Sequence, residues 1–144
     1  MRGLMRRLRA SWRALRVLLH LLHGLALLAL RLPLLDEAAR RRRVQGWSAR
    51  LLRLAGLQRR VSGTPRPGAT LLLANHVSWL DIAAIHAAAP HARFVAKAEL
   101  RRWPLLGWMS HAAGTLFIER AHKRDALRVV HRLAEALRDG DSVV

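Results

Sequence analysis

The sequence predicts an α/β fold, in which a partial, parallel-type sheet with flanking helices is preceded by N-terminal membrane-associated helices. Three observations lead to this prediction. The first 60 residues combine arginine-rich segments with an uncharged apolar run. From residue 69 onward, short apolar segments alternate with longer segments of helical periodicity. The alternation of strands and helices is typical of layers whose neighbouring strands run parallel.

Positive charge is concentrated in the first part of this 144-residue chain, whose formal net charge is +17 at pH 7. Residues 1–60 contain 15 arginines and two acidic residues, whereas residues 61–144 contain 11 basic and seven acidic residues. Such a segment requires an anionic partner, either a phospholipid surface or nucleic acid. A codon preference for arginine is an alternative explanation, which accounts for the excess of arginine over lysine better than for the clustering.

The segment 1–35 is expected to associate with a membrane. Leu4, Leu8, Trp12 and Leu15 recur at helical spacing among its arginines. This spacing predicts an amphipathic helix that leads into the apolar run 17–30. As a helix, this 14-residue run covers roughly 21 Å of a hydrocarbon core of roughly 30 Å. We therefore favour a helix in one leaflet with its arginines on lipid phosphates. A full span, a cleaved signal peptide and a core helix remain alternatives.

The segment 36–60 predicts a basic connecting helix with one apolar face. Four consecutive arginines, 40–43, precede Trp47 and several leucines at helical spacing. A solvated charged face on an ordinary connecting helix explains the arginine run equally well. Glycines and prolines at residues 63–68 then predict a turn at the entry to the third segment, 61–144.

Three strands are predicted within the third segment, at residues 70–74, 93–96 and 115–118. The first is continuously apolar, as expected for a parallel strand that is buried on both faces. Residues 142–144 predict the beginning of a further strand.

Helices are predicted between these strands. Residues 79–89 are apolar on nearly all sides and precede Pro90, so we expect a buried helix. Residues 125–138 form one apolar stripe at helical spacing, with Gly140 as the C-cap. The stretch 100–111 is expected to be mixed and to break at Pro104 and Gly107.

The strongest candidate for chemistry is the segment Asn75–Asp81 (NHVSWLD), at the junction of the first predicted strand and the buried helix. Functional sites are built at this edge of parallel sheets. His76 can act as a general base if a carboxylate orients its ring. On a straight helix five residues separate two side chains by roughly 140°, so His76 must lie in the loop and Asp81 in the first helical turn, after Ser78 as N-cap. The competing interpretation is structural, because Ser78 and Asp81 also match a capping box.

This segment resembles the first signature block of the glycerophospholipid acyltransferases, typified by 1-acylglycerol-3-phosphate acyltransferase. The second block of that family, a Gly-x-x-Phe-Ile-acidic-Arg strand, is matched by Gly114–Arg120 (GTLFIER). Residues 94–100 and 104–107 are also similar to the family's sequence between the two blocks. The resemblance covers about residues 61–144, and the N-terminal segments match only in type.

The resemblance implies an O-acyltransferase of phospholipid biosynthesis, which moves a fatty acyl group from acyl carrier protein or coenzyme A to the hydroxyl of lysophosphatidic acid. His76 would take the hydroxyl proton, Asp81 would orient His76, and Arg120 would clamp the acceptor phosphate. The remaining substrate-binding residues would be Gly114, Asn75 and Ser78. Another lysolipid acceptor, such as a lyso-ornithine lipid, and an inactive membrane-binding fragment are the alternatives.

No metal or cofactor is expected besides the acyl thioester as co-substrate. The chain contains no cysteine and no Gly-x-Ser-x-Gly motif, and its eight histidines form no His-Glu-x-x-His set. The expected partners are a lysophospholipid, an acyl carrier protein or coenzyme A thioester, and an anionic membrane surface. Nucleic acid is not expected, because the arginines flank an apolar run, and the sequence contains no tyrosine and only two phenylalanines. The expected location is the cytoplasmic face of a bacterial inner membrane.

The family's third block, a Phe-Pro-Glu-Gly-Thr loop that helps to hold the acceptor phosphate, has no match in residues 1–144. The strand that leads into this loop is expected to begin at about residues 141–144. We therefore expect residues 61–144 to be the truncated N-terminal portion of an acyltransferase domain. The 144-residue polypeptide alone is expected to have little or no turnover.

Overall fold

The computed structural model of the protein describes residues 2–64, 66–119 and 125–144. Helices and short parallel strands form two compact units. The first unit consists of Met1–Ser62 and Ser78–Pro90, and the second consists of Gly63–Val77 and His91–Val144. These units differ from the three segments distinguished in the sequence, because the helix that begins at Trp79 belongs to the first unit.

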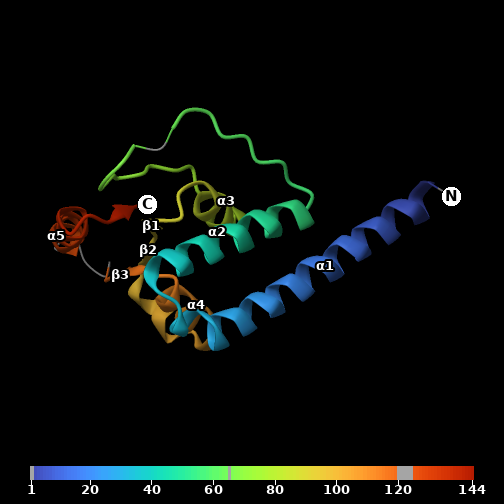
Figure 1. Ribbon diagram of the computed structural model, residues 1–144, viewed down its shortest axis with the longest axis horizontal. Helices are drawn as coiled ribbons and strands as arrows, with labels where there is room; N and C mark the ends of the chain where they lie inside the picture. The colour runs from blue at the N-terminus through green and yellow to red at the C-terminus, as the bar shows by residue number, and fades with distance from the viewer. Residues whose placement is uncertain (1, 65, 120–124) are drawn as a thin grey trace. The chain divides into compact units, whose positions relative to one another are not determined.

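The first unit begins with a helical hairpin (Figure 1). Helix α1 (Arg2–Leu30) is continuous and about 44 Å long, so the predicted amphipathic and apolar parts belong to one helix. The 3₁₀ turn η1 (Leu32–Leu34) connects it to α2 (Glu37–Leu54). The Asp36 side chain caps α2 by accepting a 2.7 Å hydrogen bond from Ala39 N.

An exposed apolar stripe follows α1 along its length. At about 100° per residue, its members lie within an arc of roughly 140°: Leu4, Met5, Leu8, Trp12, Leu15, Leu18, Leu19, Leu22 and Leu30. Arg6, Arg9 and Arg13 lie on the opposite side of the helix, which further along carries the residues that face α2. Among the described residues, α1 is the one helix long and apolar enough to cross a membrane, and only 11% of its apolar window is buried.

His20 of α1 and Trp47 of α2 hold the hairpin together. Trp47 Nε1 donates to His20 O at 3.2 Å, and His20 Nε2 lies 3.0 Å from Trp47 O. The two rings stack with their centroids 5.0 Å apart. Gly24 makes this approach possible, because a Cβ atom there would lie 2.6 Å from the Trp47 indole. Burial, which outweighs the hydrogen bond to Trp47, lowers the pKa of His20.

Helix α3 (Trp79–Ala88) completes the first unit by packing on α2. Leu51 and Leu52 of α2 form a buried core with Ala83 and Ala87 of α3, whose small side chains allow the two helices to approach closely. The helix predicted at residues 79–89 is confirmed. Its N-terminal part is less buried than predicted, since the Trp79 side chain is exposed.

His86, which is buried on α3, is expected to make the stability of the protein sensitive to acid. Burial lowers the pKa of His86 from 6.5 to about 4. The folded state therefore favours the neutral ring, so this contribution is complete above about pH 6.5 and is lost as the pH falls towards 4. The difference in pKa corresponds to about 3 kcal/mol of unfolding free energy.

We expect the urea concentration at the midpoint of unfolding to decrease as the pH is lowered from 7 to 4. The variant His86→Leu is expected to reduce this decrease. His131→Gln is the matched control, because His131 is exposed on helix α5 (Asp125–Arg138). The assignment is wrong if both variants keep the acid sensitivity of the parent protein.

In the second unit, short strands form two parallel pairs. Strand β1 (Ala92–Arg93) pairs with β4 (Ser142–Val143), and β2 (Val95–Lys97) pairs with β3 (Leu116–Ile118). The parallel direction agrees with the prediction, but the single strand predicted at 93–96 is divided between the two sheets. Phe94 lies at the division, where its carbonyl accepts a hydrogen bond from Leu116 N at 2.7 Å.

The strand predicted at residues 70–74 is reduced to an isolated bridge between Leu71 and Val143. Leu72 N donates to Val143 O at 2.7 Å, and Val143 N donates to Thr70 O at 2.9 Å. Leu73 is 91% exposed, so the prediction that this segment is buried on both faces is wrong. Among the described residues, the partner of this segment is strand β4, which is only two residues long and therefore cannot form a longer ladder with it.

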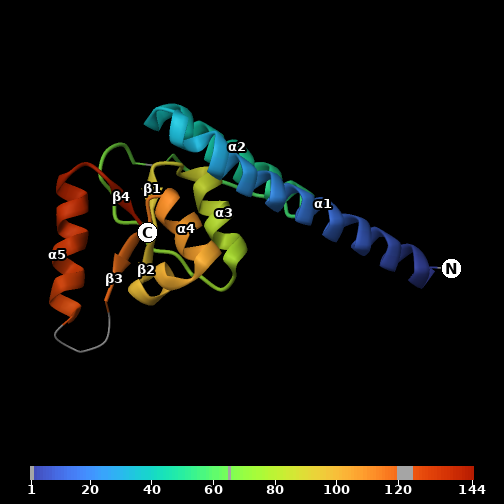
Figure 2. The same cartoon turned by 90° about the horizontal axis from the view of Figure 1, so that it is seen from below.

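Helices flank these strands. The 3₁₀ helix η2 (Ala98–Arg102) leads into α4 (Pro104–Ala112), and α5 (Asp125–Arg138) precedes β4. In both views α5 lies on one side of the strands and α4 on the other (Figure 2). The range of α5 matches the prediction, and the positive φ of Gly140, +92°, suits the predicted C-cap.

A break is predicted at both Pro104 and Gly107, and the prediction is wrong for Gly107. Pro104 begins α4, where its missing N–H costs no hydrogen bond. Gly107 lies inside the helix, and a Cβ atom there would lie 2.4 Å from Arg101 O. The glycine therefore allows α4 to pack directly against the backbone of η2.

Candidate active site

The predicted catalytic segment leads into α3, where Ser78 is the N-cap and Asp81 lies in the first turn. Leu80 N donates to Ser78 Oγ at 3.2 Å, and Ser78 N donates to Asp81 Oδ2 at 2.7 Å. These contacts belong to a capping box, so the structural interpretation of this residue pair is present in the molecule. The predicted helix start at Trp79 is confirmed.

The capping contact is compatible with a second role of Asp81. A carboxylate offers about four lone-pair sites on two oxygens, and the contact with Ser78 N uses one of them. The capping box also fixes the position of the half-buried carboxylate, and its charge complements the helix dipole. A fixed carboxylate of this kind is what a histidine base requires for orientation of its ring.

Asn75 and His76 lie in residues 63–77 of the second unit, where the chain from residue 72 to 77 has no regular secondary structure. Both side chains are exposed, so the imidazole is accessible to a substrate. Asp81 belongs to the first unit. The pairing of His76 with Asp81 therefore remains a prediction from the sequence.

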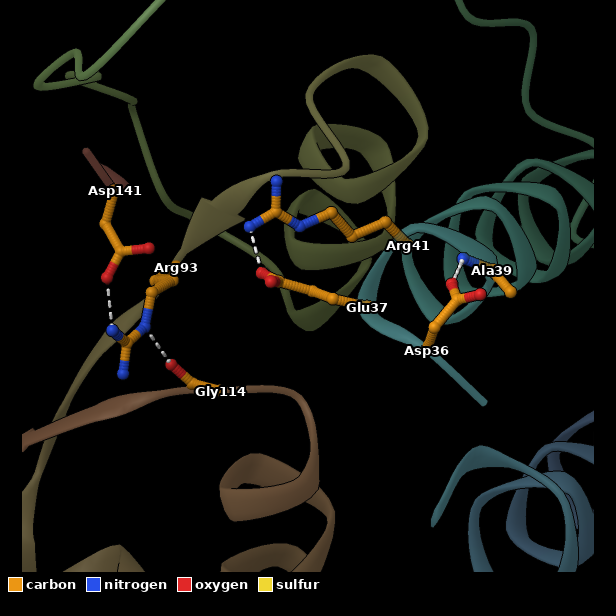
Figure 3. A network of polar contacts seen from close by, with 7 residues as sticks. All are labelled: Asp36, Glu37, Ala39, Arg41, Arg93, Gly114 and Asp141. Atoms are coloured by element: carbon orange, nitrogen blue, oxygen red, sulfur yellow. Dashed lines mark hydrogen bonds and ion pairs between the residues drawn. The ribbon is translucent and has the colours of Figure 1, made fainter. Parts of the chain in front are cut away.

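The second predicted block begins at Gly114, which follows the end of α4 with a φ of +75°. The Gly114 carbonyl accepts a 2.8 Å hydrogen bond from Arg93 Nε (Figure 3). This contact fixes the turn in front of β3, the strand that leads towards Arg120. Arg120 itself, the predicted phosphate clamp, lies outside the residues that the structure describes.

Arg93 is a residue that sequence reasoning did not single out. Besides its bond to Gly114, its guanidinium donates to the carboxylate of Asp141, just before β4 (Figure 3). Arg93 thereby connects the turn before β3 with the residue before β4. The signal in the sequence was an arginine within an apolar strand, which needs an acidic partner from a distant segment.

Other polar contacts in the same view are local. Arg41 and Glu37 form an i, i+4 ion pair on α2, with both side chains substantially exposed (Figure 3). Pairs of this kind contribute only about 0.3–0.5 kcal/mol. Within residues 2–64, 66–119 and 125–144, no cluster of three or more histidine, aspartate or glutamate side chains could hold a metal ion.

Comparison with known proteins places these features in a family. The family model described as Acyltransferase matches residues 39–144. Over 97% of its length, the chain is 42% identical to a lyso-ornithine lipid O-acyltransferase of Pseudomonas aeruginosa, of which it spans 56%. Over 76% of its length it is 37% identical to a lyso-ornithine lipid O-acyltransferase of Rhizobium meliloti, of which 38% is covered.

A third relative is a 1-acyl-sn-glycerol-3-phosphate acyltransferase of Neisseria gonorrhoeae. It is 46% identical over 77 residues, which are 54% of this chain and 30% of the relative. The chain thus spans between about one third and somewhat more than half of these relatives. No solved structure matches the chain.

Proposed function

Because the chain belongs to the glycerophospholipid acyltransferase family, we propose that the protein transfers a fatty acyl group from an acyl thioester to the free hydroxyl of a lysolipid. The observation that carries this proposal is the segment Asn75–Asp81, in which an exposed histidine precedes a helix with a capped aspartate in its first turn. The donor is an acyl carrier protein or coenzyme A thioester.

The proposed reaction is a direct transfer. His76 takes the proton of the acceptor hydroxyl while the hydroxyl oxygen attacks the thioester carbonyl carbon. When the tetrahedral intermediate collapses, the carbon–sulfur bond breaks and the leaving thiolate takes the proton from the imidazolium. Asp81 orients the ring and stabilises its charged form. The chain contains no cysteine on which an acyl-cysteine intermediate could form.

We place a lyso-ornithine lipid first among the acceptors. The P. aeruginosa relative, whose name specifies this acceptor, aligns with 97% of the chain and hence with α1 and α2 as well. The lysophosphatidic acid acceptor predicted from the sequence is the second candidate, favoured by the Neisseria relative. In both cases Arg120 is proposed to bind the anionic group of the acceptor through its guanidinium fork.

We further propose that α1 lies in the plane of the cytoplasmic leaflet of a bacterial inner membrane. Its apolar stripe continues through the arginine-rich half, with Arg6, Arg9 and Arg13 on the opposite side. This distribution suits a helix at the interface, where apolar side chains enter the acyl region and guanidinium groups remain at the headgroups. A helix that crossed the bilayer along its whole length would place these charges in hydrocarbon.

Acyl transfer by the full-length protein in detergent-solubilised membranes tests the proposal. With a labelled acyl thioester, we expect ornithine lipid to form at least about tenfold faster than phosphatidic acid, because a tenfold preference needs only about 1.4 kcal/mol of differential transition-state binding. A reversed preference assigns lysophosphatidic acid as the acceptor. If the folded protein esterifies neither lysolipid, the proposed activity is wrong.

A further inference from the structure

A groove of about 480 Å³ runs between α1 and α2 within the first unit. Arg42, Arg43 and Arg50 line it from α2, and His23 lines it from α1. Leu27 and Trp47 belong to its apolar part. None of the described residues that line it is acidic, so the groove combines positive charge with apolar surface.

The three arginines fit an anionic ligand. None of them forms an ion pair with an acidic residue of the described chain. Guanidinium groups bind phosphate through paired N–H donors, and a phosphate among them would also relieve their mutual repulsion. Charge complementarity therefore indicates a phosphate-bearing occupant.

The groove has a rigid aromatic side. His23 stacks on His20 with ring centroids 5.9 Å apart, and His20 stacks in turn on Trp47. The hydrogen bonds between His20 and Trp47 hold this stack in place. A site that is already ordered loses little conformational entropy on binding.

The position of the groove distinguishes a lipid from a free phosphate ion. At about 100° per residue, His23 lies roughly 20° from Leu30 and roughly 40° from Leu19, both members of the exposed apolar stripe. The groove therefore borders the stripe. We propose that it is a headgroup site for an anionic phospholipid, in which Arg42, Arg43 and Arg50 contact the phosphate and the acyl chains lie along the stripe of α1.

This site concerns retention on the membrane and is independent of the acyl-transfer proposal. The general attraction between arginines and an anionic surface raises membrane affinity roughly fivefold per arginine, wherever the residue lies near the surface. A headgroup site in the groove predicts an effect beyond this general attraction. If the groove is a specific site, lipid affinity depends on the position of each arginine and on the volume of the groove.

Co-sedimentation of the 144-residue chain with vesicles separates the two possibilities. The vesicles contain phosphatidylcholine with or without one fifth phosphatidylglycerol. The groove variant is Arg43→Gln/Arg50→Gln, and the matched control is Arg40→Gln/Arg53→Gln, which removes the same charge from α2 outside the groove. We expect the groove variant to lose at least about tenfold more affinity for the anionic vesicles than the control, as loss of charge-assisted contacts to a bound phosphate predicts.

A third variant blocks the groove without changing the charge. Gly46 lines the groove inside α2, and a Cβ atom built there has no neighbour within 4 Å. Gly46→Leu should therefore fold, with a gain in helix propensity, and place its side chain in the groove. We expect a loss of affinity comparable to that of the groove variant, although an added leucine would raise non-specific membrane binding. Circular dichroism verifies the helical content of each variant.

Two results would overturn the proposal. Equal losses in the two double variants, together with unchanged binding by Gly46→Leu, would reduce the groove to part of a generally basic surface. If glycerol 3-phosphate or inorganic phosphate raises the melting temperature of the chain as much as a short-chain phosphatidic acid does, the occupant is a free phosphate. No stabilisation by the soluble phosphates, with stabilisation by the lipid, supports the headgroup site.

Discussion

Replacing His76 by glutamine is expected to lower the rate of acyl transfer by about 10²–10⁴-fold, because the variant cannot take the acceptor proton. Glutamine keeps the polarity and approximate size of the side chain, and His76 is exposed, so folding should be unaffected. The decisive measurement is the rate at saturating lysolipid and acyl thioester in the full-length protein. A variant with the parental rate would remove the general base from the mechanism.

Asp81→Asn separates the catalytic role of Asp81 from its structural role. The asparagine side-chain oxygen can still accept the hydrogen bond from Ser78 N, so the capping box is retained while the negative charge is lost. We expect the rate to fall at least about tenfold with little change in stability, since the imidazolium is no longer stabilised.

Asp36→Ala is the control for the loss of an aspartate at a helix start. It removes the cap of α2 and should cost about 1 kcal/mol of stability with no effect on the chemical step. If Asp81→Asn destabilises the protein like Asp36→Ala but leaves the rate unchanged, Asp81 is only a capping residue.

Gly107→Ala is expected to have the largest effect on stability, about 3 kcal/mol or more. The new Cβ atom would lie 2.4 Å from Arg101 O and 2.8 Å from Leu100 O. Both atoms belong to the backbone, so no side-chain rotation relieves the contact, and α4 has to move away from η2. The free energy of unfolding from urea titrations measures the loss, and hydrogen exchange of the α4 amides locates it.

Gly46→Ala is the matched control, because it is also a substitution inside a helix but has open space around the added atom. It should stabilise the protein by up to about 1 kcal/mol through helix propensity. If Gly107→Ala is as stable as Gly46→Ala, α4 does not pack against η2 as the structure describes.

The elements that could be predicted from the sequence are those determined by local chemistry. The apolar stripe of α5 and the glycine after it define the range of that helix. The capping box defines the start of α3. Both signals depend on residues within one or two helical turns of each other, and short-range interactions of this kind leave a regular pattern.

Features that depend on distant partners could not be predicted. An apolar run such as residues 70–74 does not reveal how many strands lie beside it, and here only Leu71 forms a bridge. Gly107 resembled a helix breaker because the contact that requires a glycine lies in η2. The partners of Arg93, Gly114 and Asp141, lie 21 and 48 residues away along the chain, so the sequence around Arg93 does not identify them.

The same distinction applies to the candidate site. The Ser78 cap and the position of Asp81 at the helix start follow from a local motif and are present. Gly114 has a structural role in the turn that Arg93 holds, and its role in substrate binding, which the family resemblance implies, stays a prediction. The His76–Asp81 pair stays a prediction, which the His76→Gln and Asp81→Asn variants test, and the phosphate clamp at Arg120 also stays a prediction.

The position of β4 has a consequence for the order in which the chain folds during synthesis. Val143 is fully buried and forms backbone hydrogen bonds with the segment around Leu71. It belongs to β4, the strand that pairs with β1. The β2–β3 pair needs only residues up to Ile118, whereas the other sheet must wait for residue 143. At about 5–20 residues per second, a ribosome needs roughly one to five seconds for that interval. Throughout it, Leu71 and Ala92 lack their strand partner, so this strand edge is open to chaperones and to other chains.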